Sequence, residues 1–111
     1  MKAMIWHNPR CSKSREALAI LEAAGKDVTI VEYLKMPPDA EELGRLYARA
    51  GMTARDGLRL AEPEAKPLKD ASEDEILAAM AANPILIERP IVETAKGVRL
   101  GRPPEKVREI L

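Results

Sequence analysis

The alternation of apolar and polar positions predicts a strand, a helix and a second strand at the start of the chain. Residues 2–7 include a continuous apolar run, which is typical of a central strand covered on both faces. Residues 12–24 place their apolar positions at helical spacing, with Ser12 as the expected N-cap and Gly25 as the stop. Residues 27–34 predict the second strand. A strand, a helix and a strand within about thirty residues form a parallel crossover unit.

The middle of the chain, residues 39–82, predicts a helical insertion. Helices are expected at 39–50 and 72–82, because each begins with a polar residue that is followed three positions later by Glu42 or Glu75. This spacing is that of a capping box, in which side chain and backbone bond reciprocally at the helix start. Between them, the pattern predicts a shorter helix at 53–60 and then a surface loop.

The end of the chain predicts two strands and a helix. Residues 91–94 and 98–101 are expected to form an antiparallel hairpin around a glycine-containing turn, after an extended stretch at 85–87. A final helix is expected from 103, with its apolar residues inward. The predicted fold class is therefore α/β, with a mixed four-stranded sheet in the order β-α-β, helical insertion, β-β-α. We expect residues 1–111 to form a single domain.

Composition excludes several classes of function. Eighteen basic and eighteen acidic side chains cancel, so no global field draws the protein to nucleic acid or to an anionic membrane. Aromatic residues make up 3% of the chain, which argues against a surface that stacks nucleic-acid bases. No apolar run approaches the ~20 residues of a membrane span. We therefore expect neither a nucleic-acid partner nor a membrane partner, and any anion site must be local.

The single cysteine indicates the redox environment in which the protein works. One cysteine cannot form an internal disulfide, and no apolar signal segment follows Met1, so we expect a reducing, cytoplasmic location. One cysteine and one histidine also do not make a metal ligand set, so no metal site is expected. We expect a monomer.

Cys11 is the candidate nucleophile, because it lies where the first strand passes into the first helix. A thiol at a helix N-terminus meets the positive end of the helix dipole and unpaired backbone N–H groups. Arg10, Lys13 and Arg15 add positive charge nearby. Each of these effects favours the thiolate over the thiol.

Ser14 and His7 are the polar neighbours of this cysteine. The run Cys11-Ser12-Lys13-Ser14 has a hydroxyl where many redox sites have a second cysteine, so an outside thiol must resolve a covalent intermediate on Cys11. The Ser14 hydroxyl, one turn along the helix, is expected to donate a hydrogen bond to the Cys11 thiolate. His7 has two possible roles: as a cation it lowers the pKa of Cys11, and as a neutral ring it hydrogen-bonds the loop. The alternative is a packed histidine that titrates normally.

The order of predicted elements resembles the thioredoxin fold. In that fold the reactive cysteine follows the first strand, and a cis-proline opens the third strand opposite it. Pro90 stands at the matching position. The resemblance therefore implies a cis Arg89–Pro90 bond, although only about 5–6% of such bonds are cis in folded proteins.

A more specific resemblance is carried by segments spread over nearly all of the chain. They are His7-Asn8-Pro9 with Cys11 and Ser14-Arg15, Tyr33-Leu34 with Pro37-Pro38, Leu58-Arg59, residues 83–87, Arg89-Pro90-Ile91-Val92 and residues 99–103. In this order and near this spacing, the chain resembles the glutaredoxin-coupled bacterial arsenate reductases.

The resemblance implies the chemistry of the site. It implies that Arg59, Arg89 and Arg102 hold arsenate and its thiol adduct around Cys11, with His7, Ser14 and Arg15 in the catalytic motif. Guanidinium groups suit this role because they remain charged and bind oxyanions through paired N–H donors. The implied reaction reduces arsenate to arsenite through a thioarsenate on Cys11, with glutathione as co-substrate, glutaredoxin as partner and no bound cofactor. Taken singly, an arginine is usually a solvated surface charge; this alternative is weakest for Arg89, and Arg102 could instead pair with Glu105.

Two other functions remain open from the sequence. Stress-responsive transcription regulators that bind RNA polymerase have the same fold and similar segments, but they typically carry a Cys-x-x-Cys switch, which Ser14 breaks. A glutathione-linked thiol reductase acting on another substrate also fits, because glutathione is itself anionic.

Overall fold

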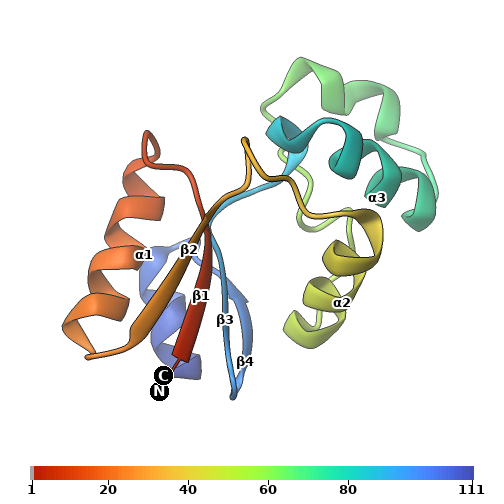
Figure 1. Cartoon of the computed structure of the whole chain (residues 1–111). Helices are drawn as coiled ribbons and strands as arrows, with labels where there is room; N and C mark the ends of the chain where they lie inside the picture. Colours follow the sequence, from red (N-terminus) through yellow and green to blue (C-terminus); the bar gives the residue numbers. More distant parts are fainter. Residues whose placement is uncertain (1) are drawn as a thin grey trace. The chain divides into compact units, whose positions relative to one another are not determined.

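The computed structural model describes residues 2–111, and Met1 lies outside the described residues. The chain divides into two compact units. The first consists of the residues before Pro37 together with Arg89–Leu111, and it contains the sheet (Figure 1). The second is Pro37–Glu88, which includes the predicted helical insertion.

The first unit is a mixed four-stranded sheet with helices, as predicted. Its strands run in the order β2-β1-β3-β4; β1 pairs with β2 in parallel and with β3 antiparallel, and β3 pairs with β4 antiparallel. The elements are β1 (Lys2–His7), α1 (Ser12–Ala23), β2 (Asp27–Glu32), β3 (Ile91–Thr94), β4 (Gly97–Leu100) and the 3₁₀ helix η3 (Pro104–Ile110). The final helix of the prediction is thus a 3₁₀ helix.

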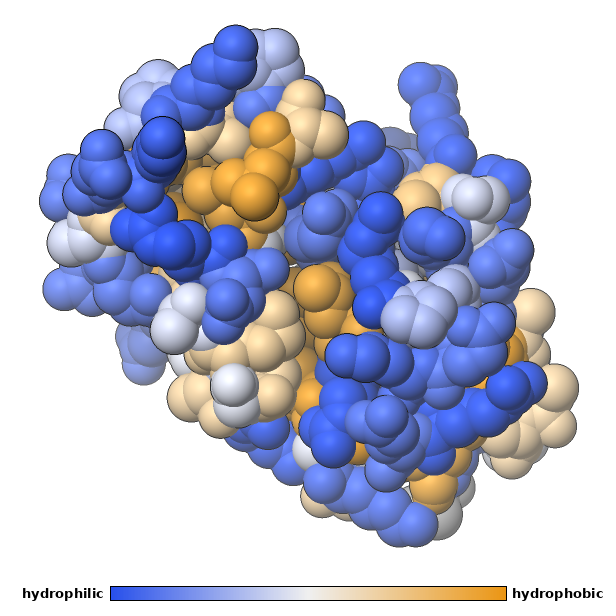
Figure 2. Space-filling view, turned by 180° about the vertical axis from the view of Figure 1, so that it is seen from behind, coloured by the Kyte–Doolittle hydropathy of each residue, from blue (hydrophilic) through white to orange (hydrophobic). Residues whose placement is uncertain are grey.

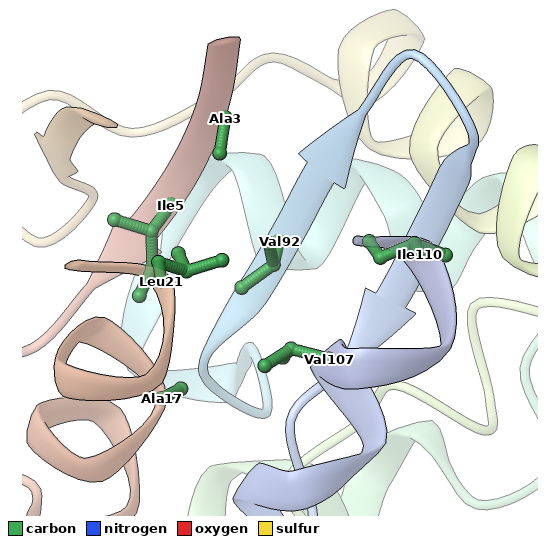
Figure 3. Packing of buried hydrophobic residues seen from close by; sticks show 7 residues of the cluster. All are labelled: Ala3, Ile5, Ala17, Leu21, Val92, Val107 and Ile110. Atoms are coloured by element: carbon green, nitrogen blue, oxygen red, sulfur yellow. The ribbon is translucent and has the colours of Figure 1, made fainter. Parts of the chain in front are cut away.

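One face of this sheet packs against α1 and η3. Ile5 of β1 lies directly opposite Val92 of β3, so both side chains point to the same face, where they are fully buried. Figure 3 shows them converging with side chains of the two helices. The buried cluster consists of Ala3, Ile5, Ala17, Leu21, Val92, Val107 and Ile110. This core fixes α1 and η3 against the face that β1 and β3 form.

The second unit is helical, and its two α-helices begin where the capping signals predict. Its elements are α2 (Ala40–Ala50), η1 (Pro63–Leu68), α3 (Glu73–Ala82) and η2 (Pro84–Leu86). The Asp39 side chain accepts a hydrogen bond from the Glu42 N–H at the start of α2. Ser72 and Glu75 form the full reciprocal capping box of α3. Gly51, at φ 70°, ends α2 in a conformation that favours glycine.

The predicted short helix at 53–60 is wrong. Thr53 and Asp56 do bond reciprocally, but they close only one turn. The backbone beyond it then bonds elsewhere: the Arg59 N–H donates to Leu86 O, and the Glu88 N–H donates to Gly57 O, each at 2.8 Å. Groups engaged across the unit in this way cannot supply the i→i+4 bonds of a helix.

Two other local predictions need correction. The predicted loop at 61–71 contains η1, and the predicted extended stretch at 85–87 contains most of the 3₁₀ turn η2, so that only Ile87 is extended. In both places a proline stands at the first position of the short helix, where its missing N–H costs nothing.

The face of the molecule in Figure 2 is mostly hydrophilic, in keeping with the 32% of charged residues in the chain. Figure 2 shows one face, on which hydrophobic patches are scattered among polar side chains. The large hydrophobic residues that are exposed in the described chain are Ile30, Leu34, Met36 and Leu60. None of the helices within residues 2–111 is long and apolar enough to cross a membrane.

Candidate active site around Cys11

Cys11 occupies the N-cap of α1, one residue before the predicted cap. Its backbone is extended (φ −94°, ψ 122°), its N–H donates to Asn8 O at 3.0 Å, and its carbonyl accepts from the Arg15 N–H at 3.0 Å. Ser12 is therefore the first helical residue. The thiol consequently stands where a capping oxygen would normally meet the free N–H groups of the first turn.

The surroundings of Cys11 lower the pKa of its thiol. Burial by itself raises this pKa, but backbone N–H groups of Ser14 and Lys13 and the guanidinium of Arg89 lower it by more. Each of these donors stabilises the thiolate. The shift has the direction predicted from the sequence. The cation that lowers the pKa of Cys11 differs from the prediction: it is Arg89, and not the neighbouring side chains of Arg10, Lys13 or Arg15.

The sheet register explains why Arg89 meets Cys11. Trp6 pairs with Ile91 in the antiparallel ladder of β1 and β3, so the loop after β1 lies beside the residues before β3. Arg89 is 9% exposed, and hydrogen bonding from its side chain and its positive charge are both among the causes that lower the pKa of Cys11. The Arg89–Pro90 peptide is cis, as the resemblance implied.

Arg102 lies beside Arg89, on the segment that follows the neighbouring strand β4. Ile91 pairs with Leu100, and the register continues beyond the ladder: Gly101 N–H donates to Pro90 O at 2.8 Å, and Arg102 Nη1 donates to Arg89 O at 3.2 Å. The Arg102–Pro103 bond is also cis, which the sequence did not predict. Arg89 and Arg102 thus lie next to each other in the unit that contains Cys11.

His7 and Ser14 form a buried pair beneath the loop. His7 Nδ1 lies 2.6 Å from Ser14 Oγ, which also accepts the Asn8 N–H at 3.1 Å. Burial lowers the pKa of His7, with Glu32 opposing this effect and Arg15 adding to it, and the net result is a lowered pKa. The ring is therefore neutral at pH 7, as in the second of its two predicted roles, but its hydrogen-bond partner is Ser14 in the first turn of α1 and not a residue of the loop.

The predicted hydrogen bond from the Ser14 hydroxyl to Cys11 is wrong. This hydroxyl instead lies within hydrogen-bond distance of His7 Nδ1 and accepts the Asn8 N–H. The Ser14 backbone N–H, and not its hydroxyl, stabilises the Cys11 thiolate and lowers its pKa. The side chain at this position faces back toward the strand end, because the first turn of α1 packs on the loop. Arg15 is exposed and donates from Nη1 to Pro9 O at 3.0 Å, which ties the same loop to the helix.

Arg59 lies in the second unit, where it is held at two points. Its N–H donates to Leu86 O at 2.8 Å, next to the β-bridge between Leu58 and Ile87. Its guanidinium pairs with Glu62, with 3.4 Å between Nη1 and Oε1. The side chain of Arg59 is 28% exposed.

Two residues of the site appear in the matching segments of the sequence but were given no role there. Asn8 braces the loop, because its Oδ1 accepts the Arg10 N–H at 3.0 Å and its carbonyl accepts the Cys11 N–H. Gly101 packs flat against Pro90: a Cβ atom added there would lie 2.8 Å from Pro90 Cγ. In the sequence, the sign of this contact is a glycine at the end of the last predicted strand, β4, which pairs with β3 next to Pro90.

A pocket of about 330 Å³ flanks the loop on the side of β2. It is lined by His7, Asn8, Pro9, Arg10, Glu32, Leu34 and Lys35. Both signs of charge line it, and Cys11 is not among its lining residues, so it is distinct from the contacts around the thiol. Within residues 2–111, no group of three or more His, Cys, Asp or Glu side chains could hold a metal ion.

A cysteine at the start of the first helix and a cis-proline just before the third strand of a mixed sheet are typical of a thioredoxin-like protein. The chain belongs to the ArsC family, whose sequence pattern matches residues 6–110. This finding confirms the family resemblance.

Individual relatives agree over the whole chain. An arsenate reductase of Rhizobium meliloti is 44% identical over 100% of this chain and 82% of its own. The protein YfgD of Escherichia coli, described as uncharacterized, is 46% identical over 96% of this chain and 94% of its own. The solved structure of an arsenate reductase from Vibrio cholerae superposes with a TM-score of 0.94, at 47% identity, and covers 100% of this chain and 98% of that one.

Proposed function

We propose that this protein is an oxidoreductase that reduces arsenate to arsenite, with Cys11 as its nucleophile. The observation that carries the proposal is the Cys11 thiol at the N-cap of α1, with its pKa lowered by backbone N–H groups and by Arg89. The arsenate reductase named among its relatives, at 44% identity over the full chain, supports the choice of arsenate.

In the first step, the Cys11 thiolate attacks pentavalent arsenic. A sulfur–arsenic bond forms, an arsenic–oxygen bond breaks, and the departing oxygen leaves as water after taking up protons. Arg89 and Arg102 support this step, because guanidinium groups offset the repulsion between an anionic nucleophile and an anionic substrate and stabilise charge on the arsenate oxygens. Arg59 is the third proposed anion ligand.

In the second step, an outside thiol completes the reduction, because Ser14 cannot form a disulfide. The proposed reductant is glutathione. Its thiolate bonds to the Cys11 sulfur, and the electron pair of the sulfur–arsenic bond stays on arsenic, which becomes trivalent and leaves as arsenite. Glutaredoxin then removes glutathione from Cys11 by thiol–disulfide exchange. His7 and Ser14 hold the loop in this scheme, and Arg15 ties it to α1.

A coupled assay tests the proposal. Purified protein receives arsenate, glutathione, glutaredoxin, glutathione reductase and NADPH, and NADPH oxidation is followed. We expect arsenate-dependent oxidation that Cys11→Ser abolishes and that Ser12→Ala, an exposed neighbour, leaves intact. With glutaredoxin shown to be active on a standard mixed disulfide, the absence of arsenate-dependent oxidation would refute the proposal. Full activity in Cys11→Ser would refute the mechanism.

A further inference from the structure

The pocket on the β2 side of the loop after β1 is built next to Cys11, from residues of the first unit alone. Its lining comes from the end of β1, from that loop and from the segment in which β2 ends. Arg10 lines the pocket and is the residue before Cys11. Asn8 also lines it and accepts the Cys11 N–H at 3.0 Å. A molecule bound in this pocket therefore lies beside the residue that carries the thiol.

The charged groups of the pocket are two cations and one carboxylate. Arg10 is exposed, and no hydrogen bond or ion pair within residues 2–111 engages its guanidinium. Lys35 lies 3.5 Å from Glu32, but the two side chains are 78% and 44% exposed. Such a surface pair contributes little to stability, so Lys35 is available to another anion. The charge of Glu32 raises the pKa of His7 against the larger effect of burial, which shows that this carboxylate is near the buried wall of the pocket.

This set of charges suits a small peptide better than an inorganic oxyanion. Glutathione carries two carboxylates and one ammonium group at pH 7, which are complementary to two cations and one carboxylate. Arsenate has no positive group to pair with Glu32 and is repelled by it. The volume of about 330 Å³ falls within the range of about 300–1,000 Å³ for small-molecule sites. Pro9 and Leu34 add apolar surface to the lining.

The pocket also lies on the side from which a second thiol would approach Cys11. β1 lies between β2 and β3 in the sheet (Figure 1). Arg89, the proposed ligand of arsenate, precedes β3, whereas the pocket is on the β2 side. A thiolate that bonds to the Cys11 sulfur approaches in line with the sulfur–arsenic bond that breaks, from the side opposite arsenic. With arsenic held toward Arg89, this approach comes from the β2 side.

We propose that this pocket binds glutathione, with Arg10 and Lys35 pairing with its two carboxylates and Glu32 with its ammonium group. The choice of ligand rests on the proposed function, in which glutathione is the reductant. An extended tripeptide spans about 10 Å, and the Cα atoms of Arg10 and Cys11 are about 3.8 Å apart, so the thiol of a peptide held at Arg10 is within reach of Cys11.

Binding of S-methylglutathione, which has no free thiol, tests the site without any reaction. A titration followed by amide chemical shifts gives its Kd, and the shifts should fall on residues 8–10 and 32–35. We expect Arg10→Ala and Lys35→Ala each to raise this Kd by about twofold to fivefold, the range for one exposed ion pair. Lys2→Ala is the matched control, because Lys2 is an exposed lysine at the other end of β1, and it should leave Kd unchanged.

A single turnover without glutaredoxin gives the second readout. The glutathione concentration that half-saturates the rate of arsenite formation should rise in Arg10→Ala and Lys35→Ala by the same factor as Kd.

Three results would overturn the inference: no shifts at the pocket residues, equal Kd values in all variants, or displacement of S-methylglutathione by arsenate. Arsenite formation together with unchanged binding in the variants would refute the glutathione site and leave the proposed function standing. Weakened binding in the variants, with no arsenite from the wild type, would refute arsenate reduction and support the site. The two failures are therefore distinguishable.

Discussion

At the scale of the residue, the reactivity of Cys11 depends on one buried cation and two backbone donors. The N–H groups of Lys13 and Ser14 are fixed by the helix and cannot be removed by ordinary substitution. Arg89 is the removable contributor, and it acts both through a hydrogen bond to the sulfur and through its charge. Its effect on the thiol can therefore be measured directly.

We expect Arg89→Ala to raise the pKa of Cys11 toward the value of about 8.5 for a free thiol. The rate of alkylation by iodoacetamide, measured against pH, gives this pKa as its midpoint. Arg10→Ala is the matched control, because Arg10 precedes the cysteine but is not among the groups that shift its pKa. A wild-type midpoint at or above about 8.5, or equal shifts in both variants, would contradict this account.

His7 gives a second prediction, on stability against pH. Its pKa is lowered in the folded protein, chiefly by burial, so the unfolded chain binds a proton more readily. This contribution to stability is fully present above the unfolded value of about 6.5 and is lost as pH falls from there toward the folded pKa.

We therefore expect the free energy of unfolding to fall more steeply below pH 6.5 in the wild type than in His7→Asn. Urea unfolding at a series of pH values, taken as the difference between the two proteins, isolates the contribution of this side chain. A difference of the opposite sign would mean that His7 is a stabilised cation, which is the other role that the sequence allowed.

Ser14 shows what could not be predicted at this scale. The sequence predicted that its hydroxyl points to Cys11, because the two residues lie one turn apart. The structure buries the hydroxyl against His7, a strand residue seven positions earlier. Helical spacing gives the distance between two residues of a helix, but it does not give the packing of that helix on its own loop.

At the scale of the element, local signals predicted where helices begin and could not predict pairing between distant segments. Asp39 and Ser72 cap α2 and α3 because capping involves residues three apart in sequence. The segment at 57–59 bonds to 86–88 instead of forming a helix. Nothing in the local pattern encodes that partner.

Gly101 gives a prediction at this scale. A Cβ there would lie 2.8 Å from Pro90 Cγ, so Gly101→Ala must displace the proline that follows Arg89. We expect a loss of about 1–3 kcal/mol in the free energy of unfolding, together with reduced activity.

Gly44→Ala is the matched control for this change. The added Cβ would meet Leu77 Cδ1 at 3.6 Å, an ordinary contact, inside α2. Alanine is favoured over glycine in a helix, so this variant should be neutral or slightly more stable. Denaturant unfolding of both variants checks the pair, and equal effects would contradict the proposed contact between Gly101 and Pro90.

At the scale of the whole molecule, the proposed anion site depends on the topology of the sheet and not on net charge. Basic and acidic side chains are equal in number, so no long-range field attracts an oxyanion. The antiparallel register of β1, β3 and β4 instead gathers the loop after β1, the segment before β3 and the segment after β4. Cys11 and Arg89 are brought together by that register although they are 78 positions apart in the sequence, and Arg102 contacts the Arg89 carbonyl.

The sequence predicted this meeting only through resemblance. The apolar periodicity predicted the strands, and the order β-α-β, insertion, β-β-α predicted the fold. The cis-proline and the roles of the arginines were predicted only from motifs shared with a known family. The Arg102–Pro103 cis bond and the Arg102 contact with the Arg89 carbonyl depend on tertiary packing, which no local pattern in the chain reports.

In the proposed reaction, Cys11 first bonds to the arsenic of arsenate and then forms a mixed disulfide with glutathione as arsenic is reduced. A single-turnover experiment tests it most directly: the protein is mixed with arsenate and one equivalent of glutathione, without glutaredoxin. Arsenic species are then separated, and the Cys11 peptide is weighed by mass spectrometry. We expect one arsenite for each Cys11 that carries a glutathione, and neither product from Cys11→Ser. Arsenite formed while Cys11 stays unmodified, or no arsenite at all, would contradict the account.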